Sequence, residues 1–249
     1  MKTIERSDAA SSPVPLDALV MRTVAALCVA PNSAYKMIPG VEAYDMERDV
    51  RSYTGGMPVI AHPPCRAWSA YTAHQAKPIP GEKELGILCA DWLRREGGIL
   101  EHPAHSRLFD AAGLPKPGQR IGDTFTVQVL QAWWGYPMRK ATWLCFSMVD
   151  MRMLDFPYVE HDSRSGEGDR RRQQRMSKHQ RAATIPSLAA WLVNAARRAV
   201  VKTPCAFCGY PFDQEKLGEH GCPNCLGDGL AHNAEITGRA LAQNEADGA

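Results

Sequence analysis

The sequence lacks any long apolar run. No stretch reaches the roughly 18 apolar residues that a transmembrane helix needs, and the N-terminal segment MKTIERSDAASSPVP has no continuous apolar core of a secretory signal. These two absences predict a cytoplasmic protein. The sequence also has little net charge, because its formal charge is only +2. This charge by itself indicates neither a nucleic acid nor a membrane surface as a partner.

A disulfide framework is also missing, although the chain has eight cysteines. Four of them are single residues in apolar segments, and four form two CxxC pairs. In a reducing compartment, this usage indicates metal binding and catalysis rather than disulfides. Thirteen residues separate the two pairs, and glycines flank them, which is the spacing of a zinc ribbon. We expect one structural Zn²⁺, with His220 as a neighbour rather than a ligand, bound by Cys205, Cys208, Cys222 and Cys225.

The length and composition allow one full hydrophobic core and a small appendage. The chain has 249 residues, of which 45% are hydrophobic, and this is too short for two large domains. Strand-like and helix-like runs alternate from residue 21 onward, which predicts an α/β fold. We expect a disordered N-terminus over residues 1–18, an α/β domain over 19–201, a zinc ribbon over 202–231 and a flexible tail over 232–249.

Several elements can be assigned from periodicity and from turn residues. Asn32 and Ser33 are predicted to cap a short helix that ends at Met37. Residues 108–122 read as a loop. Strands are expected over residues 21–30, 41–45, 59–61, 99–101 and 141–149, and longer helices over 82–96, 124–134 and onward from Pro186.

Two strands are predicted to end in reactive side chains. Residues 59–61 suit a buried strand, and Pro63 and Pro64 force the chain out of the sheet just before Cys65. After one helix, the segment ILEHP repeats this pattern and carries Glu101. A strand–helix–strand crossover places the ends of two parallel strands side by side. We therefore expect Glu101 to lie near Cys65.

These segments resemble a known family. HPPCRAWS resembles the GPPCQGFS catalytic segment of cytosine-5 DNA methyltransferases, and LEHP resembles their LENV segment, in the same order and at a comparable separation. A weaker third likeness joins GYPMRKATWLCF, through Pro137 and Arg139, to their arginine-bearing strand. The resemblance covers about residues 21–200. The closest correspondences are Pro63, Pro64, Cys65, Ser69 and Glu101, with Trp68 standing for a phenylalanine of the family.

The resemblance implies a fold, a reaction and a setting. The fold is a Rossmann-like methyltransferase sheet with helices on both faces. The reaction transfers a methyl group to cytosine, with Cys65 adding to carbon 6 of the ring. Glu101 is expected to contact N3 as a general acid with a raised pKa, and Arg139 to hold the base or a phosphate. The chain as a whole resembles small phage and prophage proteins of methyltransferase type, which implies a bacterial host or a phage-infected cell.

The methyl donor implied by the resemblance is S-adenosylmethionine. Asp45 would contact its ribose hydroxyls, Asp49 would lie near its adenine, and Pro63 would line the same site. The main chain of residues 30–33, from Ala30 through Asn32 to Ser33, would surround the methionine part. The turn CVAPNSAYK that contains these residues has no glycine, whereas the family's cofactor loop is glycine-rich.

Two further differences from the family leave the substrate open. His62 stands where the family has glycine, and Arg66 where it has glutamine, which changes the charge of the pocket. Only about 35 residues follow the strand at 141–149 before the last helix, which is too few for the usual target-recognition domain. DNA would then be bound by the zinc ribbon and by the basic segment 163–181. The composition of this segment fits a solvated charged loop equally well. Otherwise the substrate is smaller, such as a deoxycytidine nucleotide.

Three alternatives to DNA methylation therefore remain at this point. The first is a pyrimidine-nucleotide-modifying enzyme that uses the same cysteine and glutamate. The second is a non-catalytic nucleic-acid-binding protein, a degenerate methyltransferase fold that carries a zinc ribbon. The third and least favoured is a catalytic metal site, because histidines beside prolines are often only packed or solvated. Its ligands would be His62, His102, His105 and Cys65.

Overall fold

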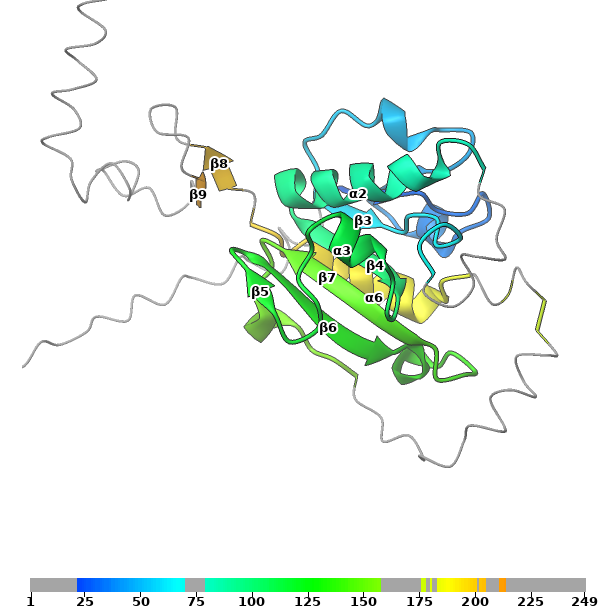
Figure 1. Ribbon diagram of the computed structural model, residues 1–249. Helices are drawn as coiled ribbons and strands as arrows, with labels where there is room; N and C mark the ends of the chain where they lie inside the picture. Colours follow the sequence, from blue (N-terminus) through cyan, green and yellow to red (C-terminus); the bar gives the residue numbers. More distant parts are fainter. Residues whose placement is uncertain are drawn as a thin grey trace, which may run out of the picture. The chain divides into compact units, whose positions relative to one another are not determined.

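The structure is a computed structural model. It describes residues 22–69, 79–157, 176–177, 180, 183–200, 202–204 and 211–213. The chain divides into two compact units, Met1–Ala199 and Val200–Ala249. The first unit contains a seven-stranded mixed sheet with helices, so its fold class is α/β, as predicted (Figure 1).

The sheet of the first unit has the strand order β2-β1-β3-β4-β7-β6-β5. The first four of these strands are parallel to one another. The remaining pairs, from β4·β7 to β6·β5, are antiparallel. The strands are β1 (Val24–Leu27), β2 (Val41–Tyr44), β3 (Val59–Ala61), β4 (Gly98–Pro103), β5 (Arg120–Ile121), β6 (Thr124–Leu130) and β7 (Ala141–Ser147).

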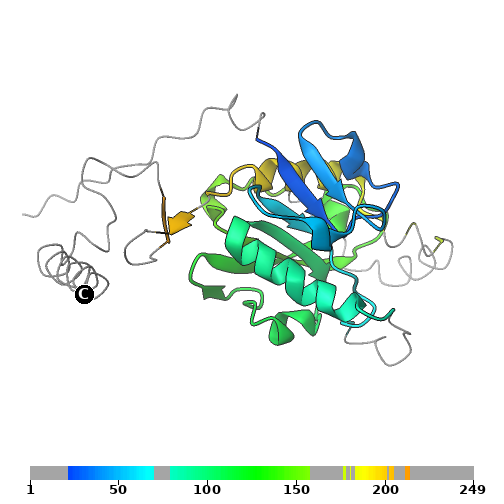
Figure 2. The same cartoon turned by 90° about the horizontal axis from the view of Figure 1, so that it is seen from above.

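Helices cover both faces of this sheet (Figure 2). Successive strand residues point to opposite faces, so Ile60 packs with α6 (Pro186–Ala196), whereas Val59 and Ala61 pack with α2 (Glu82–Glu96). The short helix α3 (Leu108–Ala111) lies on the α2 face. The single-turn 3₁₀ helices are η1 (Ala34–Met37), η2 (Val50–Ser52), η3 (Gln131–Trp134) and η4 (Met151–Met153).

Most of the predicted elements are confirmed. The helix expected over residues 82–96 has these bounds, and Gly97 ends it with φ 70° and ψ 176°, a backbone conformation that glycine adopts readily. Pro186 begins α6 at its first turn, where its missing N–H costs nothing. Ser33, rather than Asn32, caps η1, because its side chain accepts a hydrogen bond from the Tyr35 backbone N–H. The first strand is shorter than expected, since Cys28 already turns out of the sheet with φ 58°.

The helix predicted over residues 124–134 is wrong. Residues 124–130 form β6, and only the last four residues, η3, are helical. Phe125 and Val129 pack on the α6 core, and Val127 packs beside them, which is the period-two pattern of a strand. β-branched and aromatic residues favour such a pleated surface, and β6 pairs with β7 along its whole length. The predicted loop at 108–122 likewise contains α3 and β5.

The second unit contains a small antiparallel pair of strands, β8 (Lys202–Pro204) and β9 (Pro211–Asp213). Cys205 and Cys208 lie between these strands in the sequence, and Cys222 and Cys225 follow them. All four cysteines fall outside the described residues, so the zinc ribbon stays a prediction. Within the described ranges, no helix is long and apolar enough to cross a membrane.

Candidate active site

The predicted reactive residues lie at one edge of the sheet. Strands β1 to β4 are parallel, so their carboxyl ends meet at the same edge. Leu27, Ala61 and Leu100 are paired across β1, β3 and β4, and each strand continues into a polar segment beyond that level. The strand order departs from β1 in two directions, to β2 and to β3. Ligands of open α/β sheets bind at the carboxyl edge of such a switch point.

Cys65 is held at this edge by a tight turn. The His62 N–H still donates to the Leu27 carbonyl at 3.0 Å, after which the two prolines lead the chain away. The Cys65 carbonyl then accepts hydrogen bonds from the N–H groups of Trp68 and Ser69, both at 3.0 Å. Trp68 is buried and anchors the turn in the α2 core. Cys65 itself is exposed. A nucleophile has to be exposed to reach its substrate.

Glu101 lies on β4 in a network of hydrogen bonds. Its Oε2 is 3.0 Å from His62 Nδ1, and its Oε1 accepts a hydrogen bond from Gln131 Nε2 at 3.1 Å. The Gln131 amide also donates to the Thr142 hydroxyl at 3.0 Å. The side chain of Glu101 is only 12% exposed, so this carboxylate is nearly buried and is held by His62, just after β3, and by Gln131 of η3.

The ionisation of Glu101 is a correction to the sequence prediction. A raised pKa was expected, and burial does act in that direction. The hydrogen bond and the positive charge of His62, with smaller contributions from Lys140 and His102, outweigh burial and lower the pKa of Glu101 to about 2. The glutamate is therefore a carboxylate at neutral pH. The physical reason is the histidine that stands where the family has glycine.

Tyr35 extends the network to the first turn of the fold. Its hydroxyl lies 2.8 Å from His62 Nε2, and the two rings are 5.3 Å apart. Tyr35 is fully buried in η1. Burial, and then the charge of Glu101, raise the pKa of its phenol well above the ordinary value. A neutral hydroxyl therefore lies against Nε2 of His62, and Glu101 lies against Nδ1.

Lys140 is a cation that interacts with both reactive groups, and the sequence prediction missed it. Burial lowers its pKa, while Glu101 and Cys65 act in the opposite direction as nearby negative charges. The Lys140 ammonium also lies 4.9 Å from the Tyr136 ring centre, and the residue has a positive φ of 37° just before β7. Arg139, the predicted cation, is half-buried beside it and is not among the charges that shift the pKa of Cys65 or of Glu101.

The Cys65 thiol is held in its protonated form. Its pKa is raised, first because neighbouring protein atoms desolvate it and then because Glu101 carries a negative charge. Lys140 acts in the opposite direction. Glu82, at the start of α2, adds to the rise; it accepts a hydrogen bond from the Ile79 N–H at 3.0 Å and lies 3.7 Å from Arg66. The resting site therefore contains a thiol beside a carboxylate.

His102 lies behind the site. It follows Glu101 on β4 and is 1% exposed. Burial lowers its pKa to about 4, although Glu101 and the carbonyl groups of Pro63 and Pro64 favour the protonated form. Its ring nitrogens have no side-chain or main-chain hydrogen bond of good geometry within the described part of the chain. His102 is thus a neutral packing residue beneath the two prolines.

The predicted cofactor residues lie at the same edge, after β1 and β2. The Val29 N–H donates to the Tyr44 carbonyl, and the Ser33 N–H donates to the Ala30 carbonyl, which closes the turn that holds Asn32. Ala30 and Asn32 are exposed, whereas Pro63 is buried. Cys28 takes the left-handed conformation in this glycine-free turn, a conformation in which a glycine would be more usual.

Asp45 is already engaged by protein groups. Its Oδ2 is 2.5 Å from Lys36 Nζ, and its Oδ1 accepts hydrogen bonds from the N–H groups of Glu47 and Arg48. The bond from Lys36, followed by those from the backbone, lowers the pKa of Asp45 to about 2. The Asp45 side chain is 3% exposed and that of Lys36 37% exposed. A ribose hydroxyl can reach Asp45 only if the ion pair between Lys36 and Asp45 breaks.

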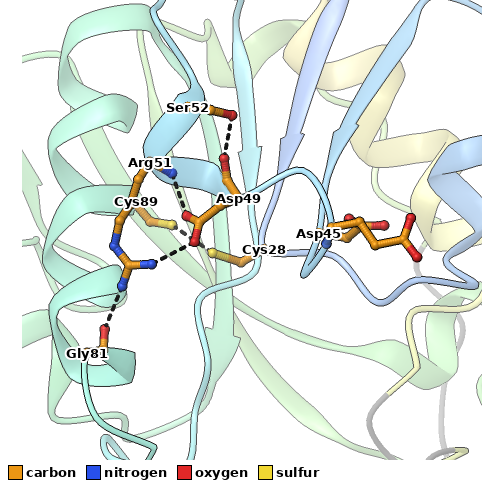
Figure 3. A network of polar contacts seen from close by, with 8 residues as sticks. Cys28, Asp45, Asp49, Arg51, Ser52, Gly81 and Cys89 are labelled. Atoms are coloured by element: carbon orange, nitrogen blue, oxygen red, sulfur yellow. Dashed lines mark hydrogen bonds and ion pairs between the residues drawn. The ribbon is translucent and has the colours of Figure 1, made fainter.

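Asp49 belongs to a separate polar network, shown in Figure 3. It caps η2, and its Oδ2 pairs with Arg51 Nη1 at 2.7 Å. Arg51 in turn donates to the Gly81 carbonyl ahead of α2 at 3.4 Å. On the other side of this network, the sulfur atoms of Cys28 and Cys89 are 3.6 Å apart. The Asp49 side chain is 50% exposed, so one side of it faces solvent.

A metal site at this edge is not supported. Over the described ranges, no group of three or more His, Cys, Asp and Glu side chains is arranged to hold a metal ion. His62, His102, His105 and Cys65 accordingly do not form the metal cluster that was the least favoured alternative. The basic segment 163–181 lies almost entirely outside the described residues.

Comparisons with protein families, with curated proteins and with solved structures find no significant match to this chain. The function is therefore argued from the residues themselves. Of these, the sequence placed Cys65 and Glu101 at neighbouring strand ends, but it missed the residues that hold Glu101. The sequence did contain one indication of them. His62 stands at a strand end where the family has glycine, and a histidine at such a position needs a polar partner. The missed residues are Tyr35, Gln131, Lys140 and Thr142.

Proposed function

We propose that the protein is a cytosine-5 DNA methyltransferase-like enzyme. The observation that carries the proposal is that an exposed cysteine follows β3 and a nearly buried glutamate lies on β4, the neighbouring parallel strand. Cys65 and Glu101 are close enough for the charge of the glutamate to raise the pKa of the thiol. A Rossmann-like methyltransferase sheet, with β1 at the switch point, agrees with the observed strand order.

The chemistry of cytosine explains why both groups are needed. Carbon 5 of the ring is a poor nucleophile, so the Cys65 thiolate first adds to carbon 6. Electron density then moves into the ring toward N3, where a group that holds or delivers a proton offsets the developing charge. Glu101 occupies that place in the proposal. Carbon 5 becomes nucleophilic enough to accept a methyl group, and loss of its proton to water and of Cys65 restores the aromatic ring.

Lys140 supplies the positive charge that this addition needs. Its ammonium interacts with both Glu101 and Cys65, and it favours the thiolate over the thiol. Arg139 is exposed enough to contact a phosphate of the substrate, which is the role the resemblance gave it. Lys140 would then act on the reacting sulfur, and Arg139 would contact the nucleic-acid backbone.

S-adenosylmethionine is the proposed cofactor, and its sulfonium supplies the methyl group. Residues 30–33, Asp45 and Asp49 lie at the carboxyl edge of β1 and β2, where an open α/β sheet binds a nucleotide. Asp45 would accept hydrogen bonds from the ribose hydroxyls in place of the one from the Lys36 ammonium. The carboxylate would thus remain hydrogen-bonded. The backbone hydrogen bonds from Glu47 and Arg48 would continue to hold Asp45 in position.

The second unit and the basic segment 163–181 of the first unit would contribute to binding rather than to chemistry. In this proposal the two CxxC pairs hold a structural Zn²⁺, and the basic segment 163–181 contacts phosphates. A duplex substrate requires its cytosine to be flipped out of the stack, at a cost of a few kcal/mol. Cys65 is exposed at the sheet edge and can meet a base presented in this way.

Methyl transfer to DNA tests the proposal. The full-length zinc-loaded protein is incubated with methyl-labelled S-adenosylmethionine and either duplex DNA or deoxycytidine nucleotides. Label in DNA, at carbon 5 of cytosine, is the expected result, and Cys65→Ser abolishes it. Label only in the nucleotides would redirect the proposal to a pyrimidine-nucleotide-modifying enzyme. Absence of label in both, together with salt-sensitive DNA binding, would overturn it in favour of a non-catalytic DNA-binding protein.

A further inference from the structure

His62 connects three elements of the site. Its Nε2 lies 2.8 Å from the Tyr35 hydroxyl of η1, and its Nδ1 lies 3.0 Å from Glu101 Oε2 on β4. Its side chain is only 11% exposed. A histidine at this position can therefore have both ring nitrogens occupied by protein partners, without solvent taking part.

Glu101 is the unprotonated partner of this pair at neutral pH. The second oxygen of Glu101 accepts a hydrogen bond from Gln131 at 3.1 Å, so the carboxylate has hydrogen-bond donors on both oxygens. With a pKa of about 2, Glu101 holds almost no proton at neutral pH. By itself it is a poor general acid there, because an effective donor has a pKa near the working pH.

We propose that His62 stores the proton that Glu101 delivers to N3 of the substrate ring, and that Tyr35 orients His62 for this task. This inference rests on the proposed function and names the proton source of that site. His62 acts through Glu101 and does not itself touch the ring. It is therefore a positioning residue with a proton-storing role, and Glu101 remains the group in contact with the substrate.

Addition of Cys65 to the ring is coupled to proton transfer from His62. Cys65 first loses its thiol proton to water. The sulfur–carbon 6 bond forms, the π-electron pair of the carbon 5–carbon 6 bond shifts into the ring, and the Nδ1 proton of the His62 imidazolium passes to the Glu101 carboxylate. Glu101 delivers this proton to N3 and becomes a carboxylate again. The neutral imidazole that remains keeps its other proton on Nε2, where it donates to the Tyr35 oxygen, and every step reverses when Cys65 leaves.

The groups around His62 favour this arrangement. An imidazolium would donate one N–H to Glu101 and the other to Tyr35, so neither donor is left unpaired. Of the other charged groups near the pair, Lys140 acts on Glu101 from the start of β7, and His102 is kept neutral at pH 7 by its burial. Tyr35 stays a neutral phenol because its burial and Glu101 raise its pKa. Of the two residues that form hydrogen bonds with Glu101 in the described part of the chain, His62 and Gln131, only His62 can release a proton.

The test compares His62→Asn with Tyr35→Phe and with the control His105→Asn. An asparagine at position 62 can still donate a hydrogen bond to Glu101 but carries no titratable proton. His105 is an exposed histidine in the loop that follows β4. The first measurement is the rate at which each full-length protein forms a covalent adduct with an oligonucleotide containing 5-fluorocytosine, as a function of pH. The second is the pKa of Glu101 in the protein alone, from its carboxyl ¹³C chemical shift.

We expect the wild-type rate to fall at high pH, and the comparison with His62→Asn assigns this fall. In His62→Asn the rate drops by about 100-fold, a typical contribution of general acid catalysis, and this alkaline fall disappears. Tyr35→Phe also slows adduct formation, because His62 loses the partner that orients it, and His105→Asn changes nothing. The pKa of Glu101 rises in His62→Asn.

Two results would overturn the inference, and they can be told apart. If the wild type forms the adduct and His62→Asn keeps the alkaline fall, His62 has only a structural role. If the wild type forms no adduct, the proposed function fails and this proton pathway fails with it, even where the ¹³C shift confirms that His62 and Glu101 are coupled.

Discussion

Glu101 lies on the strand next to the one that delivers Cys65, and its negative charge raises the pKa of the Cys65 thiol. The exposed cysteine is thus kept largely protonated until the charge of the glutamate is neutralised. A proton shared between Glu101 and N3 of a bound substrate ring would offset that charge, so that Lys140 then favours the thiolate. The arrangement links activation of the nucleophile to the presence of the base.

Removing the charge of Glu101 should therefore make Cys65 more reactive in the free protein. Glu101→Gln lowers the pKa of the thiol, so the thiolate fraction at pH 8 rises, because this pH lies below the wild-type pKa. Each unit of pKa changes that fraction about tenfold, and we expect a rise of several-fold. The measurement is the iodoacetamide alkylation rate of Cys65, read by peptide mass spectrometry.

Removing the charge of Lys140 should have the opposite effect on the alkylation rate of Cys65. Lys140→Met should slow alkylation of Cys65, because the ammonium lowers the pKa of the thiol. Arg139→Met and Glu84→Gln, which alter neighbouring charges on the surface, are the matched controls and should leave the rate unchanged. Equal rates in Glu101→Gln and the wild type would show that the two reactive groups are not coupled.

The pairing of β3 with β4 depends on one glycine. Gly98 faces Val59 across the two strands with φ 117°, and a Cβ at this position would lie 2.0 Å from the Val59 carbonyl oxygen. Gly98→Ala should destabilise the fold by more than about 4 kcal/mol or prevent folding. Gly56→Ala, at φ 89° with open space around it, should cost only about 1–2 kcal/mol. Urea unfolding compares them, and similar losses would contradict the strand register.

Asp45 should contribute to stability in a defined pH range. Its pKa is lowered from 3.8 to about 2 in the folded protein, so its contribution is full above pH 4 and is lost as the pH falls through 2. Asp45→Asn should lower the free energy of unfolding at pH 6 by about 1–3 kcal/mol, and by less at pH 3. The control Asp110→Asn, at an exposed ion pair with Lys116, should stay within about 0.5 kcal/mol.

Much of the fold could be predicted from local signals. Gly97 and Pro186 mark where α2 ends and where α6 begins, and the apolar runs of β1, β3 and β4 are buried. Residues 124–130 were mistaken for a helix because their apolar positions also fit a helical spacing. The choice between the two was made by pairing with β7, a contact that a window of sequence does not contain.

The site could be predicted only in part, for the same reason. The prolines before Cys65 and the segment LEHP pointed to two strand ends, and the crossover rule placed them together. The ionisation of Glu101 could not be foreseen, because His62, Gln131 and Lys140 come from three separate elements that only the folded sheet brings together. Burial alone predicts a raised pKa, and the partners reverse it.

Adduct formation tests the central claim most directly. The full-length protein is incubated with S-adenosylmethionine and a duplex oligonucleotide that contains 5-fluorocytosine, which blocks loss of the group at carbon 5 and so traps the intermediate. We predict a covalent complex of protein and DNA that survives denaturation, with the base attached to Cys65 in the peptide map, and no complex with Cys65→Ser. A folded wild-type protein that binds the oligonucleotide and forms no such complex would contradict the assignment of Cys65 as the nucleophile.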